Sequence, residues 1–278
     1  MRVGFLGPSG TFAEEALRAS APGGVEEEVP YPTVWDTVMA VQQRAVDQAV
    51  VPIENSLEGS VTTTLDALAG DAAGVRIVAE VVRPIEHCLI AREGVELAGV
   101  TRVLSHPQAL AQCARFLHER LAAAGTEVSG STAEAVRTAV ASSEPLAAIG
   151  TRLAAELYGG IVLAEGIEDR PDNLTRFVWL APEGTPPHAP PTKTSIVFWG
   201  FNDESPGALV AVLRELADRG VNLTKIESRP RRVQLGHYMF FADLDGGEDD
   251  TAVREALVGL SRRVETLRVL GSYRAAAI

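Results

Sequence analysis

The sequence has little cysteine, little lysine and no long hydrophobic run. Its two cysteines, Cys88 and Cys113, lie in apolar stretches, which favours free buried thiols over a disulfide, and neither has zinc-ligand spacing. No apolar run approaches the roughly 20 residues of a membrane helix. The first residues, MRVGFLGPSGTF, do not have the pattern of a signal peptide. We therefore expect a cytoplasmic protein with no membrane partner.

Acidic residues outnumber basic ones, and the formal net charge is −12. Nucleic-acid binding depends on a concentrated basic surface, so nucleic acid is not expected as a partner. Lys193 and Lys225 are the only lysines. An anionic ligand bound earlier in the chain must therefore meet backbone N–H groups or arginine, whose planar fork can bond both oxygens of a carboxylate.

Short apolar runs alternate with helical patterns before residue 181, which is typical of an α/β unit with a largely parallel sheet. Residues 76–93 form two extended runs with no helix between them and could carry the chain from one lobe to another. The stretch "PQALAQCARFLHERLAAAG", which begins at Pro107, has the pattern of one helix. Capping patterns mark three helix starts: Thr11 with Glu14, Thr33 with Asp36, and Ser131 with Glu134.

The proline-rich segment 181–194 is incompatible with a helix or a central strand and predicts a domain boundary. After it, the pattern predicts strand, helix, strand, strand, helix and strand, which is the ferredoxin-like βαββαβ order. We expect an α/β region over 1–181, a linker over 182–192 and a ferredoxin-like domain over 193–278.

Polar residues gather where predicted strands end, which is where open α/β sheets bind ligands. "GPSGTF" (7–12) could receive an anion on its N–H groups or be a tight turn capped by Thr11. "VPIENSLEGSV" (51–61) ends an apolar strand and is either a ligand loop or a capped helix start. Its polar residues include Glu54, Asn55, Ser56 and Glu58.

The stretch "VLSHPQALAQC" (103–113) repeats this arrangement. Ser105 follows a strand, His106 is placed as an N-cap and Pro107 as the first helical residue, while Gln108 and Gln112 share one helix face. Taken alone, His106 is better explained as a cap or a solvated ring than as a catalyst. Cys113 lacks a partner base, and the remaining histidines offer no ligand spacing and are treated as background: His87, His118, His188 and His237.

A third polar group opens the strand "DNLTRFVWL" (172–180), with Asn173, Thr175 and Arg176 before the apolar run. Alternation along a strand would by itself allow one polar face there.

Together these stretches resemble the prephenate dehydratase family over nearly the whole chain. The matching motifs, in order, are "GPSGTFAEEA", "PIENSLEGSV", "SHPQALAQC", "AAIGTRLAAELYG" and "IEDRPDNLTRF", followed by "GALVAVL" and "ESRP" of a C-terminal ACT regulatory domain. Gly160 departs from the apolar residue expected there. The resemblance implies two lobes like those of type 2 periplasmic-binding proteins, enclosing a cleft, with no metal or organic cofactor.

The implied reaction removes water and carbon dioxide from prephenate to give phenylpyruvate. Hydroxide is a poor leaving group and needs a hydrogen-bond or proton donor. Glu54, Glu58 or His106 could return a proton to that donor. By the resemblance Thr175 is the key catalytic residue, Arg176 a carboxylate anchor and Phe177 an orienting residue. The catalytic set is completed by Asn55, Ser105 and Gln112, and the expected substrate-binding residues are Thr11, Ser56, Glu58 and Asn173.

The resemblance also implies regulation by L-phenylalanine bound between two ACT domains of a homodimer or homotetramer. The expected effector-binding residues are Gly207, Ala208, Leu209, Glu227, Ser228, Arg229 and Pro230. Two alternatives stay open: an arogenate dehydratase, whose substrate carries an amino acid side chain in place of the keto acid, and a non-catalytic amino acid sensor.

Overall fold

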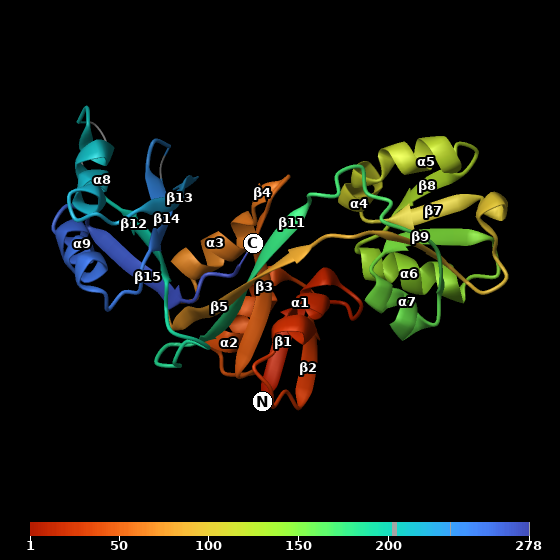
Figure 1. The fold of residues 1–278 in the computed structure, drawn as a ribbon, viewed down its shortest axis with the longest axis horizontal. Helices are drawn as coiled ribbons and strands as arrows, with labels where there is room; N and C mark the ends of the chain where they lie inside the picture. Colours follow the sequence, from red (N-terminus) through yellow and green to blue (C-terminus); the bar gives the residue numbers. More distant parts are fainter. Residues whose placement is uncertain (202–204, 234, 278) are drawn as a thin grey trace. The chain divides into compact units, whose positions relative to one another are not determined.

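The computed structural model of the chain describes residues 1–201, 205–233 and 235–277, and it divides into two compact units (Figure 1). Unit 1 contains Met1–Thr37, Val50–Val61 and Val81–Phe177, and unit 2 contains the rest of the chain. The division does not follow the proline-rich segment, because four elements contribute residues to both units: α2 (Val34–Gln42), β3 (Gln48–Asn55), β5 (Val75–Pro84) and β11 (Leu174–Pro182). The expected second domain, 193–278, ends on a residue outside the described ones.

The first sheet of unit 1 has the strand order β11-β3-β1-β2. Strands β1 (Arg2–Leu6) and β2 (Glu27–Tyr31) are parallel and are joined by helix α1 (Phe12–Ser20), while the short strand β4 (Gly59–Ser60) pairs with β3. All three predicted caps form: the backbone N–H groups of Glu14, Asp36 and Glu134 donate to the hydroxyls of Thr11, Thr33 and Ser131. The caps at Thr11 and Thr33 thereby fix loops of this sheet to helix starts.

The second sheet of unit 1 is mixed, with the order β10-β6-β9-β7-β8. Strand β7 is parallel to β8 and β9, whereas β6 is antiparallel to β9 and β10, so the expectation of a largely parallel sheet is wrong here. The chain returns without a crossover helix between β5 and β6, as the two extended runs at 76–93 predict. The bounds are β6 (Cys88–Ala91), β7 (Arg102–Ser105), β8 (Gly125–Val128), β9 (Leu146–Gly150) and β10 (Ile161–Glu165), with a short 3₁₀ helix at Leu97–Gly99.

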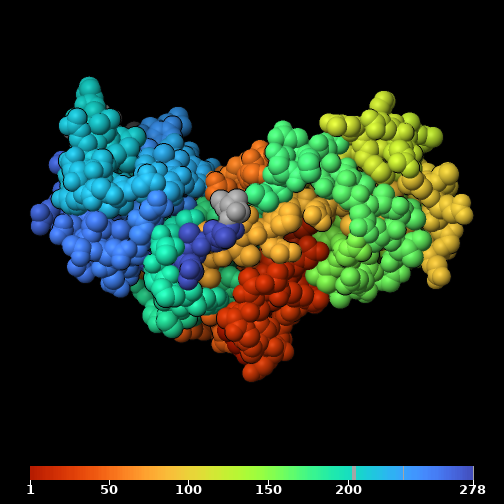
Figure 2. Space-filling model, viewed as in Figure 1, coloured from red at the N-terminus to blue at the C-terminus, as the bar shows by residue number. Residues whose placement is uncertain are grey.

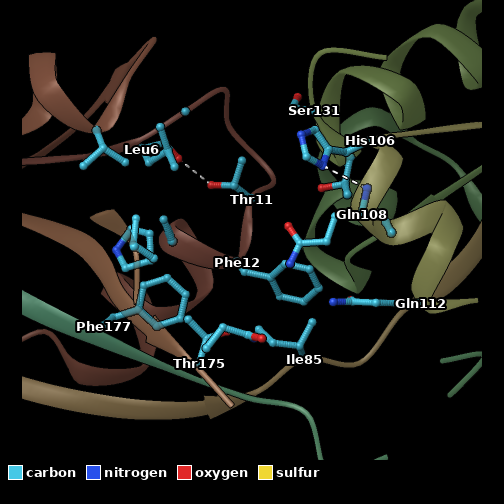
Figure 3. A pocket seen from close by; sticks show the side chains of 18 of the residues that line it. Leu6, Thr11, Phe12, Ile85, His106, Gln108, Gln112, Ser131, Thr175 and Phe177 are labelled. Atoms are coloured by element: carbon cyan, nitrogen blue, oxygen red, sulfur yellow. Dashed lines mark hydrogen bonds between the residues drawn. The ribbon is translucent and has the colours of Figure 1, made fainter. Parts of the chain in front are cut away.

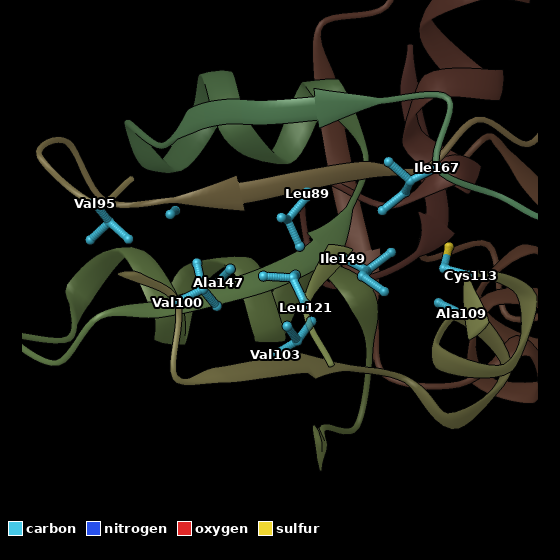
Figure 4. Packing of buried hydrophobic residues seen from close by; sticks show 11 residues of the cluster. Leu89, Val95, Val100, Val103, Ala109, Cys113, Leu121, Ala147, Ile149 and Ile167 are labelled. Carbon is cyan, nitrogen blue, oxygen red and sulfur yellow. The ribbon is translucent and has the colours of Figure 1, made fainter. Parts of the chain in front are cut away.

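Helices cover both faces of this second sheet (Figure 1). Successive residues of β6 alternate between two cores, because neighbouring side chains of a strand point to opposite faces. Leu89 packs on the α4 side with Cys113, as Figure 4 shows, while Ile90 packs on the α6 and α7 side. Both cysteines are free and buried, as expected, and burial raises the pKa of the Cys88 thiol to about 11 and that of Cys113 further still. The helices are α4 (Pro107–Gln112), α5 (Ala114–Arg120), α6 (Thr132–Ala141) and α7 (Arg152–Tyr158).

The expected single helix after Pro107 is divided at Cys113, whose φ and ψ are −114° and 19°. Asp169 explains the break. Its backbone N–H donates to the carbonyl of Gln112 at 2.6 Å, and its carboxylate accepts from the N–H of Arg115. A loop residue distant in sequence thus caps both new helix ends, which no local pattern could predict.

Two hydroxyls join the parts of unit 1 that carry its two sheets. Thr151 donates to the carbonyl of Gly10 and Tyr158 to that of Ser9, each at 2.7 Å. In Figure 2 the red surface of the N-terminal residues accordingly meets the green surface of the later segment.

Gly160, the departure from the family motif, has a packing explanation. A Cβ added there would lie 2.6 Å from Cγ2 of Ile90 and 2.9 Å from Cγ2 of Val140. These neighbours fill the space that the expected apolar side chain would take.

The C-terminal part of unit 2 has the predicted βαββαβ order, which confirms the ferredoxin-like fold. Its antiparallel sheet has the order β13-β14-β12-β15, and α8 and α9 pack on one face around Ile196, Phe198 and Leu260 (Figure 1). The bounds are β12 (Lys193–Trp199), α8 (Ala208–Ala217), β13 (Leu223–Pro230), β14 (Tyr238–Asp245), α9 (Thr251–Ser261) and β15 (Thr266–Tyr273). Unit 2 also contains α3 (Thr62–Ala69), and within the described residues no helix is long and apolar enough to cross a membrane.

Candidate active site

A cavity of about 410 Å³ lies within unit 1, lined by residues of both its sheets and their loops (Figure 3). Thr175 and Phe177 line it from β11, and His106, Gln108 and Gln112 line it from the opposite side. Its other polar lining side chains are Thr11, Asn55, His87, Ser131, Thr132 and Asn173. Among the described lining residues there is no aspartate, glutamate, lysine or arginine. The cavity therefore offers neutral donors and acceptors on a largely apolar surface.

The Thr175 hydroxyl is oriented by Asn55. The Nδ2 group of Asn55 donates to Thr175 Oγ1 at 2.8 Å, and both side chains are buried. Because the oxygen accepts this bond, the proton of Thr175 must point elsewhere. No described residue accepts this proton, and Thr175 lines the cavity, so the hydroxyl is a donor available to a ligand there.

The orientation of Asn55 is in turn set by backbone groups. The N–H groups of Leu57 and Glu58 each donate to Asn55 Oδ1 at 3.0 Å. A backbone N–H can only donate, so the oxygen of this amide must face them and its NH₂ group must face Thr175 and Asn173. The distance from Asn55 Nδ2 to Asn173 Oδ1 is 2.7 Å. Asn173 then donates from Nδ2 to Gln112 Oε1 at 3.3 Å.

His87 completes this network, although sequence reasoning treated it as background. Its Nε2 lies 3.0 Å from Gln112 Oε1, and the ring is packed edge-on against Phe12 with 5.4 Å between centroids. Only 2% of the residue is exposed, and this burial lowers the pKa of the imidazole. The available signal was a polar residue just before the apolar run "CLIA", but nothing in the sequence shows that it faces Gln112.

Several other predicted residues lie at the cavity as helix caps or wall residues. Thr11 begins α1 and donates to the carbonyl of Leu6 at 2.7 Å, and His106 caps α4 by accepting from the N–H of Gln108 at 3.4 Å. Gln108 and Gln112 both extend toward the centre of the cavity, as their shared helix face predicts (Figure 3). Phe177 is buried and lines the wall beside Thr175.

Other candidate residues do not line the cavity. Ser105 is fully buried and donates to the carbonyl of Ile149 at 2.7 Å, which ties β7 to β9. Ser56 accepts from the N–H of Leu174 at 2.9 Å and so holds the loop after β3 against β11. Glu58 contributes its backbone N–H to Asn55, and its exposed side chain is not part of the wall.

Two protein-family models match the chain. The family model for prephenate dehydratase matches residues 3–185, and that for the ACT domain matches residues 195–262. The chain belongs to the prephenate dehydratase family. It is accordingly a carbon-oxygen lyase of that family, carrying a C-terminal ACT domain.

One relative, a prephenate dehydratase of Mycolicibacterium gilvum, is 42% identical to this chain over 98% of this chain and 90% of its own length. The crystal structure of an Arthrobacter aurescens prephenate dehydratase in complex with L-Phe is 41% identical, with a TM-score of 0.90 over 99% of this chain and 90% of that one. A structure named GqqA, described as a novel type of quorum quenching acylase, is 32% identical, with a TM-score of 0.88 over 99% and 98% of the two chains.

The ACT domain of this family member contains a second cavity, of about 370 Å³, within unit 2. Gly207, Ala208 and Leu209, three of the residues predicted to bind an effector, line it together with the aromatic rings of Phe201, Tyr238 and Phe240. Gly207 precedes α8 with φ of 83°, a left-handed conformation that glycine adopts without strain.

The remaining expected effector residues, Glu227, Ser228, Arg229 and Pro230, lie on β13 and do not line that cavity. Arg229 instead forms an ion pair with Asp66 of α3, with 2.9 Å between Nη2 and Oδ2.

Arg176, expected to anchor a carboxylate, does not line the cavity beside Thr175. Its Nη2 lies 3.0 Å from Oε2 of Glu54 on the neighbouring strand β3, and 10% of the arginine side chain is exposed. Because Thr175 faces the cavity, alternation along β11 directs the next side chain to the opposite face of the strand. We propose that Arg176 supports the β3 to β11 pairing beneath Thr175.

Replacing Arg176 with leucine is expected to lower the free energy of unfolding by about 1–3 kcal/mol, between the values typical of exposed and buried pairs. The value of kcat should fall with it, because Thr175 loses its support. Denaturant unfolding and steady-state kinetics measure both, and a double-mutant cycle with Glu54→Gln isolates the pair. A raised KM with unchanged stability and kcat would restore the anchoring role.

Proposed function

We propose that this chain converts prephenate to phenylpyruvate with loss of water and carbon dioxide, in L-phenylalanine biosynthesis in the cytoplasm. The observation that carries the proposal is the orientation of the Thr175 hydroxyl. It accepts from Asn55 at 2.8 Å, so its proton is available at the cavity surface. The Mycolicibacterium gilvum relative, called prephenate dehydratase, supports the choice of substrate.

The reaction needs a donor at one particular atom. As the ring carboxylate leaves as carbon dioxide, the electron pair of the broken carbon-carbon bond moves into the ring, and the opposite carbon-oxygen bond breaks. Hydroxide would leave with the electron pair of the carbon-oxygen bond, and a hydrogen bond from Thr175 stabilises the developing negative charge on that oxygen until a proton makes it water. Ring aromatisation supplies the driving force, so orientation and partial neutralisation carry much of the catalysis.

A threonine hydroxyl can pass on a proton but is not an acid near neutral pH. Another group must therefore return a proton to it after each reaction. Glu54, Glu58 and His106 were the sequence-based candidates. Of these, His106 lines the cavity, whereas Glu54 is paired with Arg176. We propose His106 as the proton source.

The lining also bears on the choice between prephenate and arogenate. Arogenate carries an α-ammonium group where prephenate has a keto group. Within the described part of the chain, no carboxylate side chain lines the cavity to pair with that cation. A buried ammonium without a counter-ion is costly, while a keto group needs only a neutral donor such as Gln108 or Gln112. The absence of a carboxylate among the described lining residues supports the keto acid as the proposed substrate.

We expect kcat/KM for prephenate to exceed that for arogenate by at least about tenfold, because a binding site strongly rejects a substrate that leaves a polar group unpaired. Purified protein is incubated with each substrate, and phenylpyruvate or phenylalanine formation is followed. An equal or higher kcat/KM for arogenate would contradict the prephenate assignment. Binding of either compound without turnover would favour the amino acid sensor.

The likeness to GqqA, described as a quorum quenching acylase, makes acylase activity a further function to consider. Acyl transfer needs an activated nucleophile or a metal-bound water. Cys113 is fully buried, and burial raises the pKa of its thiol. The described residues contain no cluster of three metal-ligating side chains. We propose dehydratase activity over acylase activity on these grounds.

We further propose that L-phenylalanine regulates the enzyme through the ACT domain. The Arthrobacter aurescens relative was crystallised with L-Phe. In this chain the cavity beside Gly207 offers the N-terminus of α8 for an α-carboxylate and aromatic rings for an apolar side chain. Binding between two ACT domains would require a homodimer or homotetramer, which we also propose.

A further inference from the structure

We propose that His87 is a positioning residue: a neutral imidazole protonated on Nε2 that fixes the Gln112 amide so that its NH₂ group donates into the cavity. The catalytic consequence rests on the proposed dehydratase function, whereas the protonation state of the ring does not. The assignment follows from the direction of the hydrogen bonds in the network around Asn55.

The donor and acceptor atoms of each amide are determined by backbone groups that bond to Asn55. Backbone N–H groups of Leu57 and Glu58 fix the oxygen of Asn55, so its nitrogen donates to Asn173 Oδ1. With its oxygen used as an acceptor, the Asn173 amide presents its nitrogen to Gln112 Oε1. Each amide in the series thus has a single consistent orientation.

The same logic decides the state of His87. Gln112 Oε1 already faces a donor, so the atom 3.0 Å from His87 Nε2 is an oxygen that can only accept. His87 Nε2 must therefore carry a hydrogen. The ring is almost fully buried against Phe12, and this burial lowers the pKa of the imidazole more than the Gln112 hydrogen bond and the Glu168 carboxylate raise it. Nδ1 is also buried and has no hydrogen-bond partner among the described residues, so a second N–H there would be an unsatisfied donor. The ring is therefore neutral, with its proton on Nε2 and a bare Nδ1.

Gln112 Oε1 accepts from both His87 and Asn173, so the NH₂ group of the same amide remains to donate elsewhere. That nitrogen is buried and has no hydrogen-bond partner among the described residues, and Gln112 lines the cavity. Its two N–H groups can therefore serve a substrate oxygen, either the leaving hydroxyl or the keto acid. Without His87 the Gln112 amide would keep only the longer bond from Asn173, at 3.3 Å, and could rotate.

The first test measures the protonation state of the His87 ring in the absence of substrate. Nitrogen-15 NMR of histidine-labelled full-length protein should show one ring in the Nε2–H form, with no titration between about pH 5 and 8. The signal is assigned by its loss in His87→Gln. A ring protonated on Nδ1, or one that is charged at neutral pH, would overturn the assignment.

The second test distinguishes the effect of the hydrogen bond that His87 donates from the effect of the size of its side chain. His87→Gln keeps an N–H donor and should retain kcat within about tenfold of the parent, whereas His87→Leu removes the donor and should lower kcat by more than tenfold. Gln112→Glu keeps the acceptor but has no NH₂ group, so it should lower kcat, and its added carboxylate should raise the pKa of the His87 ring. Circular dichroism checks that each variant is folded.

Equal losses in folded His87→Gln and His87→Leu would overturn the positioning role, as would full activity of His87→Leu. If His87→Leu does not fold, the comparison of His87→Gln with Gln112→Glu decides, because the proposal requires the second to be slower. A parent enzyme that does not turn over prephenate would contradict the proposed function instead, and the NMR result would stand independently of it.

Discussion

Replacing Thr175 with valine is expected to lower kcat by on the order of 10² or more while the protein remains folded. Valine keeps the shape of the side chain and removes the hydroxyl that Asn55 orients at 2.8 Å. Loss of one transition-state donor typically has an effect of this size. The bond is made mainly to the departing oxygen, so kcat and kcat/KM should fall together. Steady-state kinetics with prephenate measures both.

Two variants control for this result. Thr175→Ser keeps a hydroxyl and should recover most of the lost rate. Thr37→Val removes another fully buried hydroxyl, which donates to the carbonyl of Thr33 and does not line the cavity, and it should leave kcat nearly unchanged. If folded Thr175→Val turns over at the parent rate, Thr175 is not the donor.

Replacing Gly207 with aspartate is expected to abolish inhibition by L-phenylalanine. In the parent protein we expect L-phenylalanine to weaken substrate affinity by about 5- to 150-fold. Aspartate tolerates the left-handed backbone that Gly207 adopts, at φ of 83°, and its charge suits the start of α8. The same charge repels the carboxylate of the effector. Initial rates against L-phenylalanine concentration test this, each variant being compared with its own uninhibited rate.

Gly207→Asn is the matched control, because asparagine also tolerates this backbone but carries no charge. It should retain inhibition within several-fold. The point substitution is preferable to deleting the ACT domain, since deletion would strip Glu80, whose side chain is 1% exposed, of its ion pair with Lys193. Equal inhibition of parent and Gly207→Asp would place the effector elsewhere, and no response in the parent would mean that the ACT domain binds another ligand.

Much of the fold could be predicted because its signals are local. The caps at Thr11, Thr33 and Ser131 depend on residues three positions apart, and the βαββαβ order depends on successive apolar periods. The break at Cys113 could not be predicted, because Asp169 causes it from 56 positions later in the chain. The mixed second sheet depends likewise on strand pairings that hydrophobic patterns do not specify.

The candidate site shows the same limit. Thr175, Asn55, Asn173 and Gln112 come together as the motifs indicate. Arg176 lies next to Thr175 in sequence, yet strand alternation separates their side chains, and this was available from the pattern itself. His87 was missed because its significance depends on a contact with a residue 25 positions away.

The most direct measurement of the central claim is the formation of phenylpyruvate from prephenate by the full-length protein, with Thr175→Val and Thr175→Ser assayed beside it. We predict one phenylpyruvate for each prephenate consumed by the parent, a rate lower by on the order of 10² or more for the valine variant, and substantial recovery with serine. Failure of the folded parent to form phenylpyruvate, or equal rates for parent and valine variant, would contradict it.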